Sequence, residues 1–63
     1  MIIAVDAAGG DHYPQSPVEG AIKATDEIDD LTVILVGPED LINDELSDHD
    51  YDQKRVHVQH APE

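Results

Sequence analysis

The sequence predicts an α/β fold with a parallel sheet, built in the order strand, helix, strand, helix, strand. Three short apolar runs, residues 2–5, 31–36 and 55–60, are separated by two segments with apolar residues at helical spacing. Connections of this length imply parallel strands joined by right-handed crossovers. Because the chain has only 63 residues and no cysteine, it either is a fragment of something larger or needs a partner, and we expect residues 1–63 to be part of a larger single α/β domain.

The first strand is β-branched and lacks polar alternation, which is typical of a strand buried on both faces. After a glycine-containing loop, a helix start is marked by Ser16 as N-cap, Pro17 at the first helical position and Glu19 completing a capping box. The spacing predicts a helix over residues 17–28. Gly20 is either a weak point of this helix or a place of close packing.

The second strand, residues 31–36, is the most apolar segment and is typical of a central strand. Pro38 ends it and can open a second helix, expected over residues 38–46 with acidic residues in its first turn. The third strand, residues 55–60, alternates apolar and polar residues, which predicts one wetter face.

The charge of the chain is strongly negative, with 15 Asp and Glu against 3 Lys and Arg and a formal net charge of −12. Such a surface repels the phosphates of nucleic acids and anionic membranes, so we expect no nucleic-acid partner. No apolar run is long enough to span a membrane, and the N-terminus does not resemble a signal peptide. These features are compatible with a cytoplasmic protein.

The carboxyl ends of parallel strands meet at one rim of the sheet, where open α/β sheets bind ligands. We expect this rim to gather residues 6–12, Gly37-Pro38 and residues 60–63. Gly9-Gly10-Asp11 could offer successive backbone N–H groups as an anion nest for phosphate or carboxylate. The alternative is a tight turn that needs glycine for its backbone geometry.

Asp6, Asp11, His12 and His60 could form an acid–base or metal set at this rim. The alternative is that the two aspartates fix the loop by accepting hydrogen bonds from backbone amides. The acidic run at residues 48–52 lacks the glycine and glutamate of a calcium loop, so no metal is expected there. No arrangement of Ser, His and Asp predicts a covalent nucleophile.

The sequence resembles the start of the bacterial phosphate acyltransferases of phospholipid synthesis, the PlsX family. The resemblance covers the whole chain and is carried by Ile3-Ala4-Val5-Asp6-Ala7-Ala8-Gly9-Gly10-Asp11-His12, Pro14, Val18-Glu19-Gly20-Ala21, Val33-Ile34-Leu35-Val36-Gly37 and His60-Ala61-Pro62-Glu63. The Asp-Ala-x-Gly-Gly-Asp core is its most specific part. Ala8 departs from the pattern, because the family usually has Met there.

The resemblance implies a three-layer α/β/α fold like that of isocitrate dehydrogenase. It implies an enzyme that moves a fatty acyl group from acyl carrier protein to inorganic phosphate, forming acyl phosphate. We expect no cofactor and no metal. It also implies a homodimer in the cytoplasm, loosely associated with the membrane. We expect Asp11 and His12 to be catalytic and four rim residues to bind phosphate: Asp6, Gly9, Gly10 and His60.

Two other hypotheses stay open on the residues alone. The chain could belong to a non-catalytic α/β module that binds a small phosphorylated ligand on the same rim, or the glycine loop could only turn the chain. We expect the isolated 63 residues to be inactive as an acyltransferase and to be unstable or oligomeric.

Overall fold

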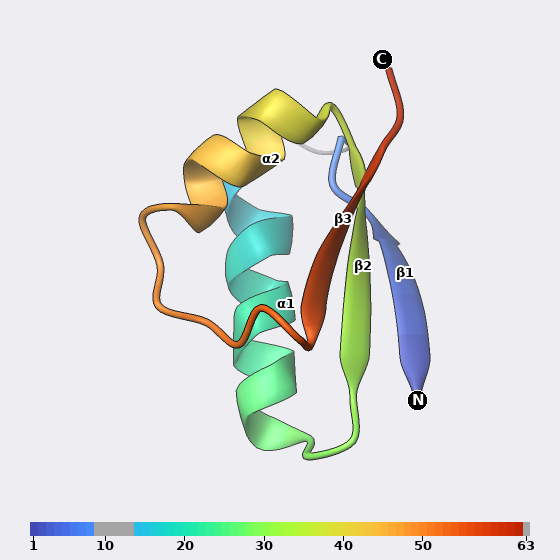
Figure 1. Ribbon diagram of the computed structural model, residues 1–63, viewed down its shortest axis with the longest axis vertical. Coiled ribbons are helices and arrows are strands. Elements are labelled where there is room, and N and C mark those ends of the chain that lie inside the picture. Colours follow the sequence, from blue (N-terminus) through green and yellow to red (C-terminus); the bar gives the residue numbers. More distant parts are fainter. Residues whose placement is uncertain (9–13, 63) are drawn as a thin grey trace.

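The computed structural model describes residues 1–8 and 14–62 and has the predicted order of strands and helices. Its five elements are β1 (Ile2–Asp6), α1 (Gln15–Glu27), β2 (Thr32–Gly37), α2 (Glu39–Leu46) and β3 (Val56–His60) (Figure 1). The strands form one parallel sheet in the order β1-β2-β3. The predicted α/β class is therefore confirmed, and each element boundary lies within two residues of its predicted place.

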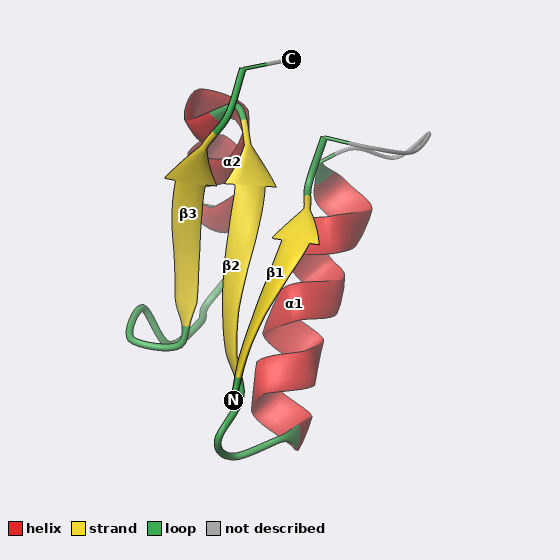
Figure 2. Cartoon of the chain, turned by 90° about the vertical axis from the view of Figure 1, so that its right-hand side faces the viewer, coloured by secondary structure: helices red, strands yellow, loops and turns green. Residues whose placement is uncertain are grey.

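Both helices lie on the same face of the sheet, so the described part of the chain has two layers (Figure 2). Along β2, Val33 and Leu35 are buried against the helices, whereas Ile34 and Val36 are half-buried and point to the other side. We call this second side the open face. The third layer of the expected three-layer fold stays a prediction.

The core between sheet and helices is entirely aliphatic, as the composition predicts. It is formed by Ala7, Val18, Ala21, Leu31, Val33, Leu35, Ile42, Leu46 and Val56. Of the polar residues in the described ranges, Thr25 alone is buried beside them, and its hydroxyl donates a hydrogen bond to the carbonyl of Ile22 at 2.9 Å. Within the described ranges, neither helix is long and apolar enough to cross a membrane.

The start of α1 differs from the prediction. The helix begins at Gln15 with Pro14 as its N-cap, so Ser16 lies inside the first turn and makes no capping hydrogen bond. Glu19 accepts a hydrogen bond from the Gln15 side chain at 3.3 Å instead of closing a capping box. The earlier start is tolerated because the first hydrogen bond within the helix is donated by the N–H of Val18. Pro17, which has no N–H, therefore costs the helix no hydrogen bond.

β1 is also less covered than predicted. Ile2 is 71% exposed and Ile3 is 42% exposed, although an apolar run without alternation is typical of a strand buried on both faces. The reason is its position: β1 lies at the edge of the sheet, and no described residue covers its open face. The apolar pattern of β1 therefore indicates surface that the residues described here leave uncovered.

Arg55, just before β3, holds the connection between α1 and β2. Its guanidinium donates from Nε to the carbonyl of Leu31 at 3.1 Å and from Nη2 to the carbonyl of Ile28. The last turn of α1 contains no basic residue. Arg55 therefore supplies, from a distant part of the chain, the positive charge that the negative end of a helix favours.

We expect Arg55→Lys to lower the stability of the full-length protein by about 1–2 kcal/mol, because an ammonium cannot span both carbonyls as the planar guanidinium does. Urea unfolding measures the loss. The matched control is Lys54→Gln, which removes the neighbouring exposed cation and should stay within about 0.5 kcal/mol of the parent. Equal unfolding midpoints for Arg55→Lys and the parent would contradict the assigned role.

Candidate functional site

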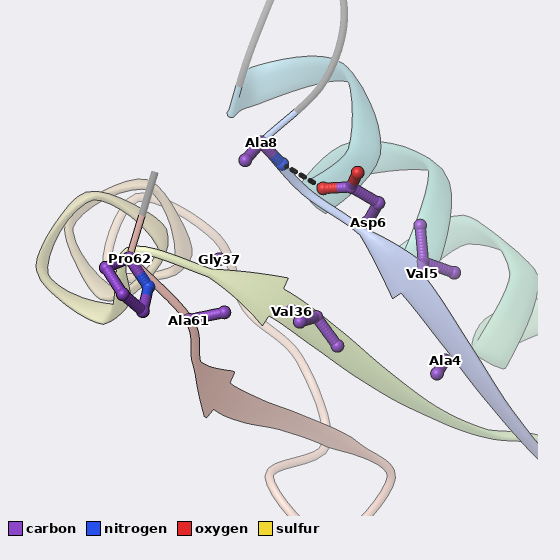
Figure 3. A pocket seen from close by; sticks show the side chains of 8 residues that line it. All are labelled: Ala4, Val5, Asp6, Ala8, Val36, Gly37, Ala61 and Pro62. Carbon is purple, nitrogen blue, oxygen red and sulfur yellow. Dashed lines mark hydrogen bonds between the residues drawn. The ribbon is translucent and has the colours of Figure 1, made fainter.

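The carboxyl ends of the three strands enclose an open crevice (Figure 3). It is lined by Ala4, Val5, Asp6, Ala8, Val36, Gly37, Ala61 and Pro62. These residues come from three separate stretches of the chain, which the parallel topology brings together as predicted. The lining is mostly apolar, and Asp6 is its one charged side chain among the described residues.

Backbone hydrogen bonds extend the sheet past its strands and shape this crevice. The N–H of Ala7 donates to the carbonyl of Val36 at 2.8 Å, and the N–H of Ala61 donates to the carbonyl of Gly37 at 2.9 Å. The segments that follow β1 and β3 are therefore both held against the end of β2.

Gly37 allows these segments to come close. A Cβ atom at this position would lie 3.2 Å from Cδ1 of Ile42 and 3.5 Å from Cβ of Ala8. Ile42 is fully buried and has little room to move away. The φ angle of 159° is close to extended backbone, so limited space is the reason for glycine here.

Asp6 shapes the turn that leaves β1. Its Oδ1 accepts a hydrogen bond from the N–H of Ala8 at 2.8 Å, as Figure 3 shows. An aspartate that accepts a hydrogen bond from the backbone two residues further along stabilises a turn. This is the loop-fixing role predicted from the sequence as the alternative for Asp6. A carboxylate also repels phosphate, so the geometry favours the loop-shaping role, and a phosphate contact by Asp6 stays a prediction.

His60 joins the end of β3 to the start of α2. Its Nδ1 accepts a hydrogen bond from the backbone N–H of Glu39 at 3.2 Å. This N–H belongs to the first turn of α2 and has no acceptor within the helix. With Nδ1 accepting, the neutral imidazole carries its hydrogen on Nε2, which can donate to an anionic or carbonyl oxygen.

The structure does not bring Asp6 and His60 together. In the sheet register, Asp6 pairs with Val36 on the open face, whereas His60 pairs with Gly37 on the helix face. Within the described parts of the chain, neither residue belongs to a group of side chains with the spacing of metal ligands. The two side chains therefore flank the strand ends on opposite sides of the sheet.

The other predicted site residues, Gly9, Gly10, Asp11 and His12, lie outside the residues that the structure describes. The anion nest and the catalytic roles of Asp11 and His12 stay predictions. The chain on either side of them is described: Ala8 lines the crevice, and Pro14 caps α1.

Sequence reasoning missed the hydrogen bond between His60 and Glu39. The two residues are 21 positions apart, and no local spacing signals their contact. The only available indication was topological, since His60 ends a strand beside the one that leads into α2.

Comparison with known proteins places the whole chain in one group. A family model described as "Fatty acid synthesis protein" matches residues 1–63. The chain is 49% identical over 63 residues to a phosphate acyltransferase of Fusobacterium nucleatum and 44% identical over 63 residues to one of Clostridium tetani, covering 100% of this chain in both cases. It is 46% identical over 56 residues, or 89% of this chain, to a phosphate acyltransferase of Clostridium perfringens.

The chain spans only part of these relatives. It covers 19% of the length of the Fusobacterium and Clostridium tetani proteins and 16% of the Clostridium perfringens protein.

Proposed function

Because the chain belongs to the fatty acid synthesis protein family, we propose that the full-length protein is a phosphate acyltransferase of phospholipid biosynthesis. It would transfer a fatty acyl group from acyl carrier protein to inorganic phosphate. The observation that carries this proposal is the 49% identity, along all 63 residues, to a relative named phosphate acyltransferase.

The reaction is attack of a phosphate oxygen on the thioester carbonyl. A carbon–oxygen bond forms, the carbon–sulfur bond breaks, and the proton of hydrogen phosphate goes to the leaving sulfur. Because phosphate is the nucleophile, no serine or cysteine of the protein needs to be acylated. This agrees with the positions of the two serines: Ser16 lies in α1, and the hydroxyl of Ser47 donates to the carbonyl of Asp44.

The strand-end crevice supports the binding half of this chemistry. Ligands of open α/β sheets bind outside the carboxyl ends of parallel strands, which is where we predict the glycine nest, and His60 with its Nε2–H ends β3 beside the crevice. Such N–H groups can hold phosphate or stabilise the oxyanion that develops on the carbonyl. Residues 1–63 would then form one wall of the site within a larger single α/β domain.

The partners of the full-length protein follow from the same proposal. They are acyl carrier protein, inorganic phosphate and a second copy of the protein in a homodimer, in the cytoplasm with a loose membrane association. Acyl carrier protein is acidic, and this chain carries a net charge of −12. We therefore place its docking surface on another part of the full-length protein or on the dimer partner.

The test is release of thiol from acyl carrier protein thioester in the presence of phosphate. We expect full-length protein to release thiol, and Gly10→Val to lower turnover at least about tenfold by blocking the approach of phosphate to the loop backbone. The unfolding midpoint of the variant is the control, and we expect it to be nearly unchanged because Gly10 lies outside the apolar segments that the sequence predicts to form the core.

The possible outcomes separate the hypotheses. Phosphate binding without thiol release would support a non-catalytic binding module. Normal turnover and phosphate affinity in Gly10→Val would mean that the loop only turns the chain.

A further inference from the structure

Three side chains of metal-ligating type meet where α1 and α2 contact each other, away from the strand-end crevice. Glu19 lies on α1, Glu45 lies in the last turn of α2, and His49 follows that helix. One carboxylate oxygen of each glutamate and one ring nitrogen of the histidine all lie within 4.8 Å of one another. Figure 1 shows the end of α2 above the first half of α1, which explains how residues 26 positions apart come together.

The spacing of two of these atoms suits a bound cation. Nε2 of His49 lies 3.0 Å from Oε2 of Glu45. This is a hydrogen-bond distance, whereas ligand atoms about 2.0–2.2 Å from a tetrahedral zinc ion are roughly 3.3–3.6 Å apart, so an ion that replaces the shared hydrogen would separate the two atoms by a few tenths of an ångström. The pair is therefore close to the separation of two neighbouring ligands, and an oxygen of Glu19, which lies within 4.8 Å of both atoms, can be the third.

The third ligand is held in position from its own helix. The amide nitrogen of Gln15, one turn earlier, donates to Oε1 of Glu19 at 3.3 Å. A hydrogen bond of this kind orients a ligating carboxylate and is typical of the groups behind metal ligands.

The charge around the three side chains also favours a cation. Asp44 and Asp48 line a surface depression with Glu45, beside Pro14 at the start of α1. The side chains of His49 and Glu45 are only 25% and 22% exposed, so water and salt screen them less than fully exposed groups. In a chain with a net charge of −12, a divalent cation at this point would relieve repulsion between the two helices.

We propose that Glu19, Glu45 and His49 bind a divalent cation of the Zn²⁺ type, which ties the start of α1 to the end of α2. One imidazole nitrogen and two carboxylate oxygens form a ligand set that zinc accepts. On binding, the neutral imidazole carries its hydrogen on Nδ1 and presents the Nε2 lone pair to the ion. This role is structural and does not rest on the proposed acyltransferase activity.

The test uses full-length protein from which a chelator has removed bound metal. Calorimetric titration with Zn²⁺ measures the stoichiometry and affinity of binding, and thermal unfolding with and without Zn²⁺ measures the gain in stability. We expect the parent to bind one more Zn²⁺ than His49→Gln, and Glu19→Gln to bind that ion at least about tenfold more weakly. Zinc should raise the unfolding temperature of the parent but not that of His49→Gln. The control is Asp48→Asn, which removes the same charge as Glu19→Gln from outside the ligand set.

Equal zinc stoichiometry and affinity in the parent, His49→Gln and Glu19→Gln would overturn the proposal. An equal loss of zinc affinity in Asp48→Asn and Glu19→Gln would also overturn the proposal, because it would show that the negative charge of the surface attracts zinc without direct ligation by Glu19. If His49→Gln does not fold, Glu19→Gln decides the question, since Glu19 is exposed and outside the core.

Discussion

Replacing Gly37 by Val is expected to destabilise the full-length protein and to abolish its proposed acyltransferase activity. The new Cβ would lie 3.2 Å from Cδ1 of Ile42 and 3.5 Å from Cβ of Ala8, and two further methyl groups would extend from it. Forcing atoms into a packed site of this kind costs about 1–3 kcal/mol. Because Gly37 and Ala8 both line the crevice, the strand ends would also move apart, and a shift of about 1 Å can cost a factor of 100 in rate.

Two other glycine substitutions serve as comparisons for Gly37→Val. Gly37→Ala adds only the Cβ and should show a smaller loss of stability in urea unfolding and of turnover in thiol release. Gly20→Ala should instead stabilise the protein by about 0.5–1 kcal/mol, because no heavy atom of the described residues lies within 4 Å of its added Cβ. Of the two interpretations of Gly20, the structure thus favours the weak point in the helix.

Full turnover by Gly37→Val would show that the crevice is not the reaction site. If only the stability of the variant is lowered, the role of Gly37 is limited to packing.

The second large effect concerns the open face of the sheet. This face carries the apolar side chains of Ile2, Ile34 and Val36, and no described residue covers it. We expect isolated residues 1–63 to self-associate or unfold at low concentration, because apolar surface of this kind favours association. Sedimentation and thermal unfolding of the dilute chain measure this.

One substitution should act in opposite directions in the two forms of the protein. In the isolated chain, Ile34→Lys should reduce self-association by placing a charge on the open face. In the full-length protein, where we expect a third layer on this face, the same lysine would be buried without a partner and should cost several kcal/mol.

Gln59→Lys is the matched control, because Gln59 lies on the same face of β3 at a position that is already polar and exposed. We expect it to change the stability of the full-length protein much less than Ile34→Lys does. A cooperative unfolding transition from a dilute monomer of residues 1–63 would contradict the first expectation. Tolerance of Ile34→Lys in the full-length protein would contradict the third layer.

The order of the elements could be predicted because their signals are local. β-branched runs, prolines after strands and apolar spacing each depend on a few neighbouring residues, and all five elements lie within two residues of the positions that these signals predict. The start of α1 was wrong by two residues because Ser16 and Glu19 match a capping pattern that the helix does not use. The exposure of β1 was missed because it depends on its place in the sheet.

The candidate site was predictable only as far as topology determines it. Parallel strands require their carboxyl ends to share a rim, so the grouping of Asp6, Gly37 and the residues after His60 follows from the strand order. The separation of Asp6 and His60 on opposite faces depends on register, which the sequence does not reveal across two crossovers. The contact of Arg55 with the end of α1 likewise arises only from tertiary packing.

The strand order β1-β2-β3 is also the order in which a ribosome makes these strands. Each strand pairs with the one synthesised before it, so the sheet can grow at the exit of the tunnel without waiting for later sequence. At about 5–20 residues per second, residues 1–63 emerge within roughly 3–13 s, whereas a protein of the relatives' length takes several times longer. During that interval the apolar residues of the open face would be available to chaperones, and the time needed to synthesise the covering part of the protein would set how long they stay exposed.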